Sequence, residues 1–261
     1  MAKVVPLFSG SKGNSYYIGT GNSGILIDAG RNCKQLEIAL HDNEISIRNI
    51  QAIFVTHEHT DHCSALRVFC KRYNIPVYAS AGTLSALSAG NKLAPDCQAK
   101  VIDREVALPN MLIKRYNTSH DASESCGYQV EMSSGKVMLA TDMGIMSSEI
   151  RGAISNSDVA IIESNHDVNM LKNGFYPYEL KRRILSDVGH LSNEDCSKEL
   201  ANFVKNNTTR FILSHLSEEN NTPNLAYQTA ICELQLQKMW LDVDYTLTIA
   251  PTVTDGKCVV F

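Results

Sequence analysis

Short apolar runs bounded by turn-forming residues recur along the whole chain, and they predict β-strands. In the first third of the chain these runs fall at residues 3–8, 15–19, 24–28, 52–56 and 76–79. Further on they fall at residues 101–102, 112–117, 127–132, 137–141, 160–163, 210–214, 245–249 and 257–261.

Helical periodicity appears between and after these strands. The predicted helices cover residues 34–40, 63–73, 83–87, 178–187, 193–206 and 225–239. Strands interleaved with helices indicate an α/β fold of two mixed sheets with helices on their outer faces. The chain has no repeat, low-complexity tract or linker rich in Pro, Gly or Ser, so we expect residues 1–261 to form a single domain.

Composition excludes several classes of protein. Hydrophobic residues make up 44% of the chain and charged residues 20%, which argues against a disordered or fibrous protein. No window approaches the roughly 18 apolar residues that cross a bilayer, and the apolar stretch near the start is too short for a signal peptide. We therefore expect a cytoplasmic protein with no membrane partner. The eight cysteines form no CxxC pair and are expected to be reduced thiols.

The strongest local signal is the segment Thr56-His57-Glu58-His59-Thr60-Asp61-His62, where an apolar strand stops and a helix follows. A turn at this place can direct His57 and His59 toward one metal ion, and Asp61 and His62 toward another. Imidazole suits zinc, and a carboxylate widens the choice to manganese or iron. A polar, solvated loop is the plainer interpretation, but such loops rarely concentrate three histidines and two acids.

Three more residues of the ligand type each follow an apolar strand. His120 lies in the segment NTSHDA, Asp142 in MLATDMG and His215 in FILSHLS. Each residue alone is more often an ordinary core or surface residue. All three residues lie just past an apolar strand, and chance does not readily produce such a joint pattern.

The order of HxHxDH, one His, one Asp and a last His resembles the metallo-β-lactamase superfamily over nearly the whole chain. The resemblance implies a four-layer αββα sandwich that holds two divalent metal ions. It also implies that Asp142 bridges the ions, with His120 completing the first site and His215 the second.

Two further segments are similar to the phosphodiesterase branch that includes tRNase Z. They are Glu163-Ser164-Asn165-His166-Asp167 and Gly189-His190-Leu191-Ser192. By this resemblance Glu163 is an orienting acid and His190 a proton donor. The tRNase Z pattern has Ser directly after His190, where this chain has Leu191, and no long arm for gripping tRNA is present, so tRNA maturation is disfavoured.

The start of the chain narrows the resemblance further. The segment from Ser9 to Ser15, together with the later LIDAG segment, resembles the bacterial WalJ/YycJ/VicX group. That resemblance implies an exonuclease acting on DNA ends.

The expected function is therefore a dinuclear-metal phosphodiesterase that hydrolyses nucleic acid, as a DNA exonuclease. Two neighbouring cations lower the pKa of a shared water, so that a hydroxide can attack phosphorus near neutral pH. Asp61 holds the proton of this nucleophile, and His190, hydrogen-bonded to Glu163, protonates the departing oxygen.

Substrate contacts are predicted at two places. The Gly-spaced loop with Ser9, Ser11, Asn14 and Ser15 has amides and hydroxyls that can hold a phosphate, although an ordinary turn is an equal alternative. His166 is expected to contact the substrate, to replace another metal ligand or to support a neighbouring ligand.

Other functions stay open at this point. A small-molecule phosphodiesterase of the cyclic nucleotide type is favoured by the net charge of −4, which gives no global attraction for a polyanion. A thioester or lactone hydrolase of the same fold would not need Glu163 and His190. A module that keeps its metals for stability alone conflicts with a ligand set that leaves an open position. The sequence does not specify the native metal, the polarity of cleavage or the oligomeric state.

Overall fold

The computed structural model describes residues 1–261 and divides into two compact units. The first unit comprises Met1–Arg115, Ala122–Ser134 and Pro251–Phe261. The second unit comprises Tyr116–Asp121 and Gly135–Ala250. The expectation that the chain is one domain stays a prediction.

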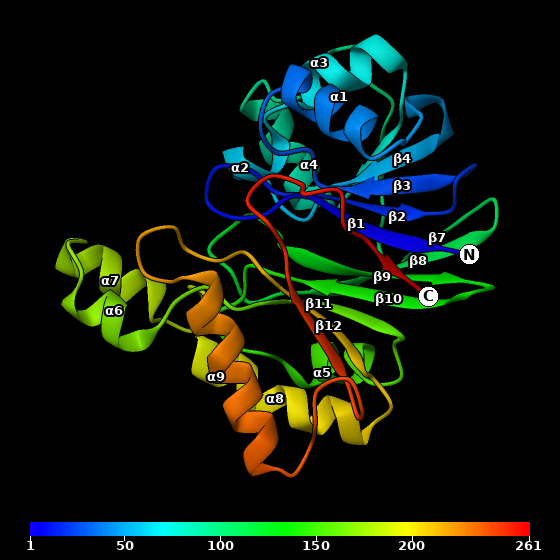
Figure 1. Cartoon of the computed structure of the whole chain (residues 1–261). Helices are drawn as coiled ribbons and strands as arrows, with labels where there is room; N and C mark the ends of the chain where they lie inside the picture. The colour runs from blue at the N-terminus through cyan, green and yellow to red at the C-terminus, as the bar shows by residue number, and fades with distance from the viewer. The chain divides into compact units, whose positions relative to one another are not determined.

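The strands of the first unit lie in two groups (Figure 1). One sheet has the strand order β14-β1-β2-β3-β4-β5-β6 and lies wholly within this unit. Its strands are β1 (Lys3–Phe8), β2 (Ser15–Gly19), β3 (Gly24–Ile27), β4 (Ile50–Phe54), β5 (Val77–Ala79), β6 (Ala99–Val101) and β14 (Val259–Val260). The other strands are β7 (Glu105–Leu108), β8 (Met111–Asn117), which continues into the second unit, and β9 (Cys126–Met132).

The first sheet is mixed, with its antiparallel strands at one side. Strands β1, β2, β3 and β14 pair antiparallel, whereas β3, β4, β5 and β6 pair parallel. Parallel pairing requires a crossover, and helices supply it. The helices of this unit are α1 (Cys33–Asp42), η1 (Ile47–Asn49), α2 (Thr60–Cys63), α3 (Leu66–Tyr73) and α4 (Ala81–Ala89).

Helix α1 shows why these segments become helical. The side chain of its N-cap residue, Asn32, accepts a hydrogen bond from the backbone amide of Gln35. In return, the side chain of Gln35 accepts a hydrogen bond from the backbone amide of Asn32, which completes a capping box. One face of α1, including Leu36 and Leu40, packs against α3 and the sheet. The core of the first unit therefore lies between its sheet and these helices.

Four parallel strands form the sheet of the second unit, in the order β13-β12-β11-β10. They are β10 (Gly135–Ala140), β11 (Val159–Glu163), β12 (Arg210–Ser214) and β13 (Thr246–Ile249). The helices of this unit are α5 (Ser148–Ile154), α6 (Val168–Asn173), α7 (Tyr178–Ile184), α8 (Asn193–Lys205) and α9 (Pro223–Leu236). Helices α5, α8 and α9 bury their apolar residues against the sheet. A central strand such as β11 is fully buried, which explains its unbroken apolar sequence.

The predicted α/β class is confirmed, because the sheet of each unit has helices packed against it. The predicted helix over 63–73 is wrong at its start, because α2 ends at Cys63 and a new helix begins at Leu66. The helix predicted over 178–187 ends at Ile184, where the chain turns toward Gly189. The helices α5 and α6 were not predicted, because each is too short to show a full apolar period. No helix has the length and hydrophobicity that crossing a membrane requires.

We predict that Leu213→Ala destabilises the protein by about 2–5 kcal/mol, because Leu213 is fully buried in β12 and its loss leaves a cavity. The measurement is urea unfolding followed by circular dichroism. Leu236→Ala is the matched control, because Leu236 is 77% exposed and its loss should change stability by less than about 0.5 kcal/mol. Equal effects of the two substitutions would contradict the assigned core.

Candidate metal centre

Three parallel strands of the second unit end at one edge of its sheet, and each is followed or closed by a polar residue. The register pairs Ala140 of β10 with Ile162 of β11, and Glu163 with Ser214 of β12. Asp142 lies two residues past Ala140, Glu163 ends β11, and His215 follows Ser214 directly. The carboxyl ends of neighbouring parallel strands lie together, so the three side chains converge.

The backbone leaves the extended conformation abruptly at two of these positions. Asp142 has φ 57° and His215 has φ 56°, in the left-handed region that residues other than glycine rarely occupy. Each such residue costs on the order of 1–3 kcal/mol unless its surroundings fix it. Here the next amide after Asp142, that of Met143, donates to Glu163 Oε2 at 3.0 Å.

Glu163 is the centre of the hydrogen-bond network. Its Oε1 accepts from Nδ1 of His190 and from Nδ1 of His215, both at 2.8 Å. Its Oε2 accepts from the amides of Met143 and Leu191, both at 3.0 Å. Complete burial alone would raise the pKa of Glu163, but the charge of His190 and these hydrogen bonds lower it to about 2.

Asp142, Glu163, His190 and His215 each offer a ligand atom, and these atoms lie within 4.8 Å of one another. The Asp142 Oδ1 atom is 3.5 Å from His215 Nδ1 and 3.9 Å from His190 Nδ1. Three of the four residues are buried, and the side chain of His190 is 15% exposed. Asp142 and His215 supply the donor types that suit a divalent cation, a carboxylate and an imidazole, and Glu163 and His190 lie beside them.

His120 joins this group through a neighbouring loop. Its Nδ1 is 3.1 Å from the carbonyl of Gly189, and its Nε2 is 3.8 Å from Asp142 Oδ1. Gly189 must be glycine here, because a Cβ would lie 2.2 Å from the carbonyl oxygen of Ile184. Burial lowers the pKa of His120, and Asp142 partly opposes that effect. His120 is therefore a neutral ring at neutral pH.

In the first unit the ligand-type residues follow β4 and gather around Asp28, which follows β3. The Asp28 carboxylate accepts from the amide and the hydroxyl of Thr56, at 2.8 and 2.9 Å, and from His62 Nδ1 at 2.8 Å. The ring of His57 lies 4.1 Å from that of His62 and 4.5 Å from that of His59, between ring centroids. His57, His59 and His62 thus form one cluster.

Asp61 is held beside this cluster by the loop after β1. The Asn14 amide group donates to Asp61 Oδ2 at 3.1 Å and also lies 3.1 Å from His62 Nε2. The Asn14 backbone amide donates to the carbonyl of Asp61 at 2.8 Å. Gly30 allows this close approach, because a Cβ there would lie 1.9 Å from the carbonyl oxygen of Asp61.

The hydrogen bonds fix the tautomers of four histidines. Nδ1 of His120 faces a carbonyl, and Nδ1 of His62 and of His215 faces a carboxylate, so each Nδ1 carries the proton. The Thr56 hydroxyl gives its only proton to Asp28, so it must accept from Nδ1 of His57 at 3.0 Å. In the neutral rings Nε2 then carries the lone pair, as metal-binding histidines do. These residues therefore fit the metal ions that the sequence predicted.

Asp28 is the functional residue that sequence reasoning missed. It lies in the LIDAG segment and follows a strand, as Asp142 does, and it also has a positive φ of 61°. The signal was an acid just past an apolar strand, but its partner His62 is 34 residues further along the chain. Only the parallel pairing of β3 with β4 brings the two together.

The residues predicted to contact the substrate differ in how deeply they are buried. Ser15 and Asn14 are buried, and the Ser15 hydroxyl donates to the carbonyl of Asp28 at 2.8 Å. Ser9 is also buried, whereas Ser11 is exposed. His166 is 1% exposed, and burial lowers its pKa to about 4, although Glu163 opposes the shift. Substrate binding by these residues stays a prediction.

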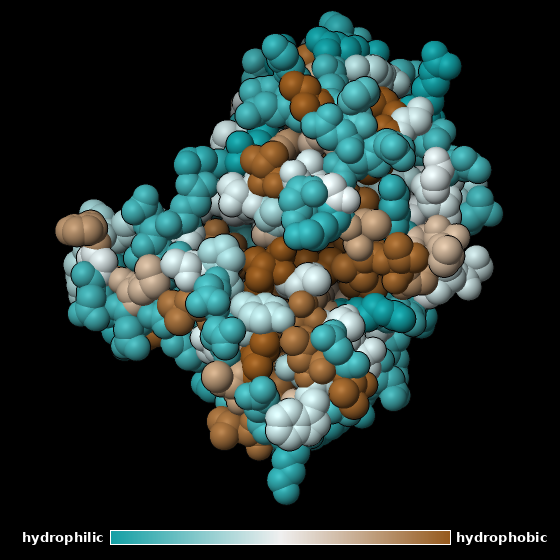
Figure 2. Space-filling model, viewed as in Figure 1, coloured by the Kyte–Doolittle hydropathy of each residue, from teal (hydrophilic) through white to brown (hydrophobic).

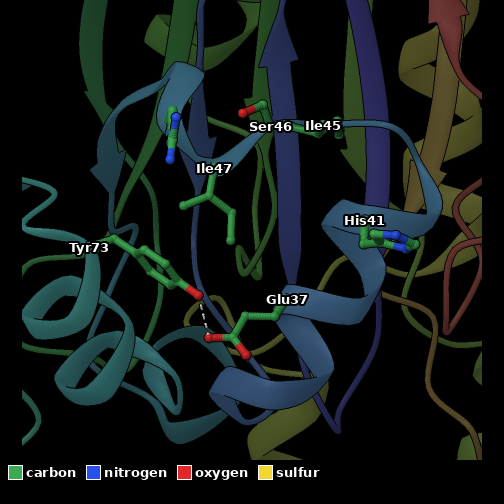
Figure 3. Close-up of a pocket in the computed structure, with 7 residues that line it drawn as sticks. Glu37, His41, Ile45, Ser46, Ile47 and Tyr73 are labelled. Atoms are coloured by element: carbon green, nitrogen blue, oxygen red, sulfur yellow. Dashed lines mark hydrogen bonds between the residues drawn. The ribbon is translucent and has the colours of Figure 1, made fainter.

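A separate cavity of about 510 Å³ in the first unit contains none of the predicted site residues (Figure 3). It is lined by Glu37, His41, Ile45, Ser46, Ile47, Arg48 and Tyr73. The Glu37 carboxylate already accepts from the hydroxyl of Tyr73 at 2.7 Å and from Arg72 at 2.5 Å. This cavity is therefore distinct from the two clusters of acids and histidines described above.

We predict that Asp28→Asn weakens zinc binding by about 10–100-fold, because the carboxylate that orients His62 is lost. The measurement is competition with a chromophoric zinc chelator. Asp42→Asn is the control, because Asp42 is exposed and lies outside the cluster, and it should leave zinc affinity unchanged. Unchanged affinity in Asp28→Asn would show that Asp28 does not support the ligands.

A second prediction concerns pH. The folded-state pKa of Glu163 is lowered to about 2, so its contribution to stability is complete above the unfolded-state value and is lost as the pH falls toward 2. At about 1.4 kcal/mol for each pKa unit, this contribution is about 3 kcal/mol. Glu163→Gln should therefore be less stable than the wild type at neutral pH, and the gap should narrow in acid.

Urea midpoints of both proteins at several pH values between about 7 and 3 test this prediction. Glu219→Gln, at an exposed position of the same unit, should follow the wild type throughout. A gap for Glu163→Gln that stays constant with pH would contradict the assigned ionisation.

Comparison with known proteins identifies relatives of this chain. The model of the β-lactamase superfamily domain matches residues 24–216. The exodeoxyribonuclease YycJ of Bacillus anthracis is 38% identical over 222 residues, which cover 84% of this chain and 84% of that protein. The exodeoxyribonuclease WalJ of Streptococcus pneumoniae serotype 2 is 35% identical over 243 residues, covering 92% of this chain and 90% of that protein.

Solved structures agree on the fold. The metallo-β-lactamase fold protein YhfI from Bacillus subtilis has a TM-score of 0.70 at 15% identity, with 97% of each chain covered. The short form of human tRNase Z has a TM-score of 0.64 at 16% identity, covering 99% of this chain and 98% of that one. The resemblance seen in the sequence is thus confirmed, and the chain belongs to the β-lactamase superfamily of hydrolases.

Proposed function

We propose that this protein is a dinuclear-metal phosphodiesterase that hydrolyses DNA as an exonuclease. The observation that carries the proposal is the hydrogen bond of 2.8 Å between Glu163, which is buried, and His190, whose side chain is 15% exposed, beside Asp142. A hydrolase that cleaves thioesters has no need of such a proton donor. Relatives covering most of the chain bear the name exodeoxyribonuclease, which supports DNA as the substrate.

The metal ligands of the proposal are His57, His59, Asp61, His62, His120, Asp142 and His215. The Nδ1 hydrogen bonds of His57, His62, His120 and His215 support the role of these rings as ligands through Nε2. When bound, two zinc, manganese or iron ions would supply a hydroxide near neutral pH and neutralise charge on the phosphoryl oxygens.

The residues of the chain then divide the proton transfers between them. Asp61, held by Asn14, holds the proton of the attacking hydroxide through a hydrogen bond. The side chain of His190 is 15% exposed and that of Glu163 is fully buried. The ring of His190 is therefore accessible from solvent, and the carboxylate of Glu163 holds it through Nδ1. Protonated His190 donates from Nε2 to the departing oxygen, and the carboxylate of Glu163 stabilises the cation.

We predict that His190→Gln lowers cleavage of a single-stranded DNA oligonucleotide by about 100–10,000-fold, because the departing alkoxide loses its proton donor. A p-nitrophenyl phosphodiester of thymidine, whose leaving group is stable as an anion, should lose much less. The measurement is kcat/KM of zinc- or manganese-loaded enzyme on both substrates.

His41→Gln is the control, because His41 is an exposed histidine outside the site, and it should behave as the wild type on both substrates. An equal loss on both substrates would contradict the proton-donor role of His190. A wild-type enzyme that hydrolyses a thioester and neither phosphodiester would overturn the proposed function.

A further inference from the structure

The loop between α6 and α7 and the first residue of α7 present large aromatic side chains to solvent. Phe175 is 105% exposed and Tyr178 is 74% exposed, and Tyr176 lies between them in the sequence. Burying a Phe side chain normally contributes about 1.5–3 kcal/mol, so full exposure forgoes that gain. Figure 2 shows hydrophobic residues beside hydrophilic ones over the part of the surface that α6 and α7 form, at the left of the view.

This loop is held in one conformation by its own contacts. The Lys181 Nζ atom donates to the carbonyl of Lys172 at 2.9 Å and to that of Gly174 at 2.7 Å. These bonds tie the start of α7 to the end of α6. Gly174 packs closely against Asn220, because a Cβ would lie 2.7 Å from its Oδ1. The exposed rings therefore stand on a fixed backbone, and little conformational entropy is lost when they bind a partner.

The same segment is basic within an acidic protein. Residues 168–185 contain four cationic side chains and one carboxylate, a net charge of +3, whereas the whole chain carries −4. Lys172 and Arg182 are exposed. Arg182 lies 3.2 Å from Glu179 in an exposed ion pair, which is worth little in water and exchanges readily for a stronger anion.

The segment is also joined to the proposed proton donor. The amide of His190 donates to the carbonyl of Ile184, the last residue of α7, at 3.0 Å. Arg183 of α7 forms an ion pair with Asp121, which follows His120. A strand held along α6 and α7 would therefore lead toward His190.

We propose that the α6–α7 segment, through Phe175, Tyr178, Lys172 and Arg182, binds the unpaired part of a single-stranded DNA substrate. This inference rests on the proposed function for the nature of the substrate. Exposed aromatic rings stack on unpaired bases of any sequence, and nearby cations contact the phosphates. A bilayer surface also attracts aromatic and basic residues, but helices of six and seven residues offer too little apolar face to insert.

The test measures DNA binding separately from cleavage. Metal-stripped full-length protein is titrated into a fluorescein-labelled oligothymidylate, and anisotropy gives the Kd. The double variant Phe175→Ala/Tyr178→Ala should weaken binding by about tenfold or more. Arg182→Ala should lower the slope of log Kd against log salt concentration by about one.

Matched variants on other surfaces of the second unit control for general effects. Trp240→Ala removes another exposed aromatic ring, and Lys205→Ala another exposed cation, and both should bind DNA as the wild type does. All variants should hydrolyse the p-nitrophenyl phosphodiester of thymidine at the wild-type rate, because they lie outside the catalytic machinery.

Unchanged oligothymidylate binding in the double variant would overturn the inference. So would a double variant that loses binding to vesicles of phosphatidylglycerol and phosphatidylcholine while keeping its DNA affinity. If instead the wild type binds DNA through these residues but cleaves no phosphodiester, the proposed function fails while the binding site stands.

Discussion

Two buried carboxylates fix four of the histidines of this protein. Asp28 holds His62 directly and His57 through the hydroxyl of Thr56, while Glu163 holds His190 and His215. A buried carboxylate is stable only when hydrogen bonds replace its hydration, and the rings and amides around each acid provide them. The same bonds that stabilise the acids set the tautomers of the rings. Stability and chemical function therefore depend on one set of contacts.

The strand ends explain how these acids reach their partners. In each unit, parallel strands bring residues distant in sequence to one edge of a sheet, and the left-handed turns at Asp28, Asp142 and His215 redirect the chain there. Such turns are costly in isolation, so they persist where many hydrogen bonds fix them. The strain lies at the residues that the chemistry needs.

Much of this could be read from the sequence, because its signals are local. Three sites follow an apolar strand within a few residues: the segment from His57 to His62, Asp142 and His215. The hydrophobic periodicity that predicts the strands and the position just after them are therefore enough to identify these residues. The role of Asp28 could not be read, since it depends on the pairing of β3 with β4. The early end of α7 depends on the contact of Gly189 with Ile184 and Arg183, which no local pattern encodes.

The single oxygen that His190 and His215 share has one more consequence. Both rings are anchored through Nδ1 to this one atom, so a movement of the Glu163 side chain would displace the two rings together. His215 is the more deeply buried of the two, so His190 is the ring that a molecule arriving from solvent reaches first. The orientation of the inner ring is therefore coupled to that of the outer ring through a single carboxylate oxygen.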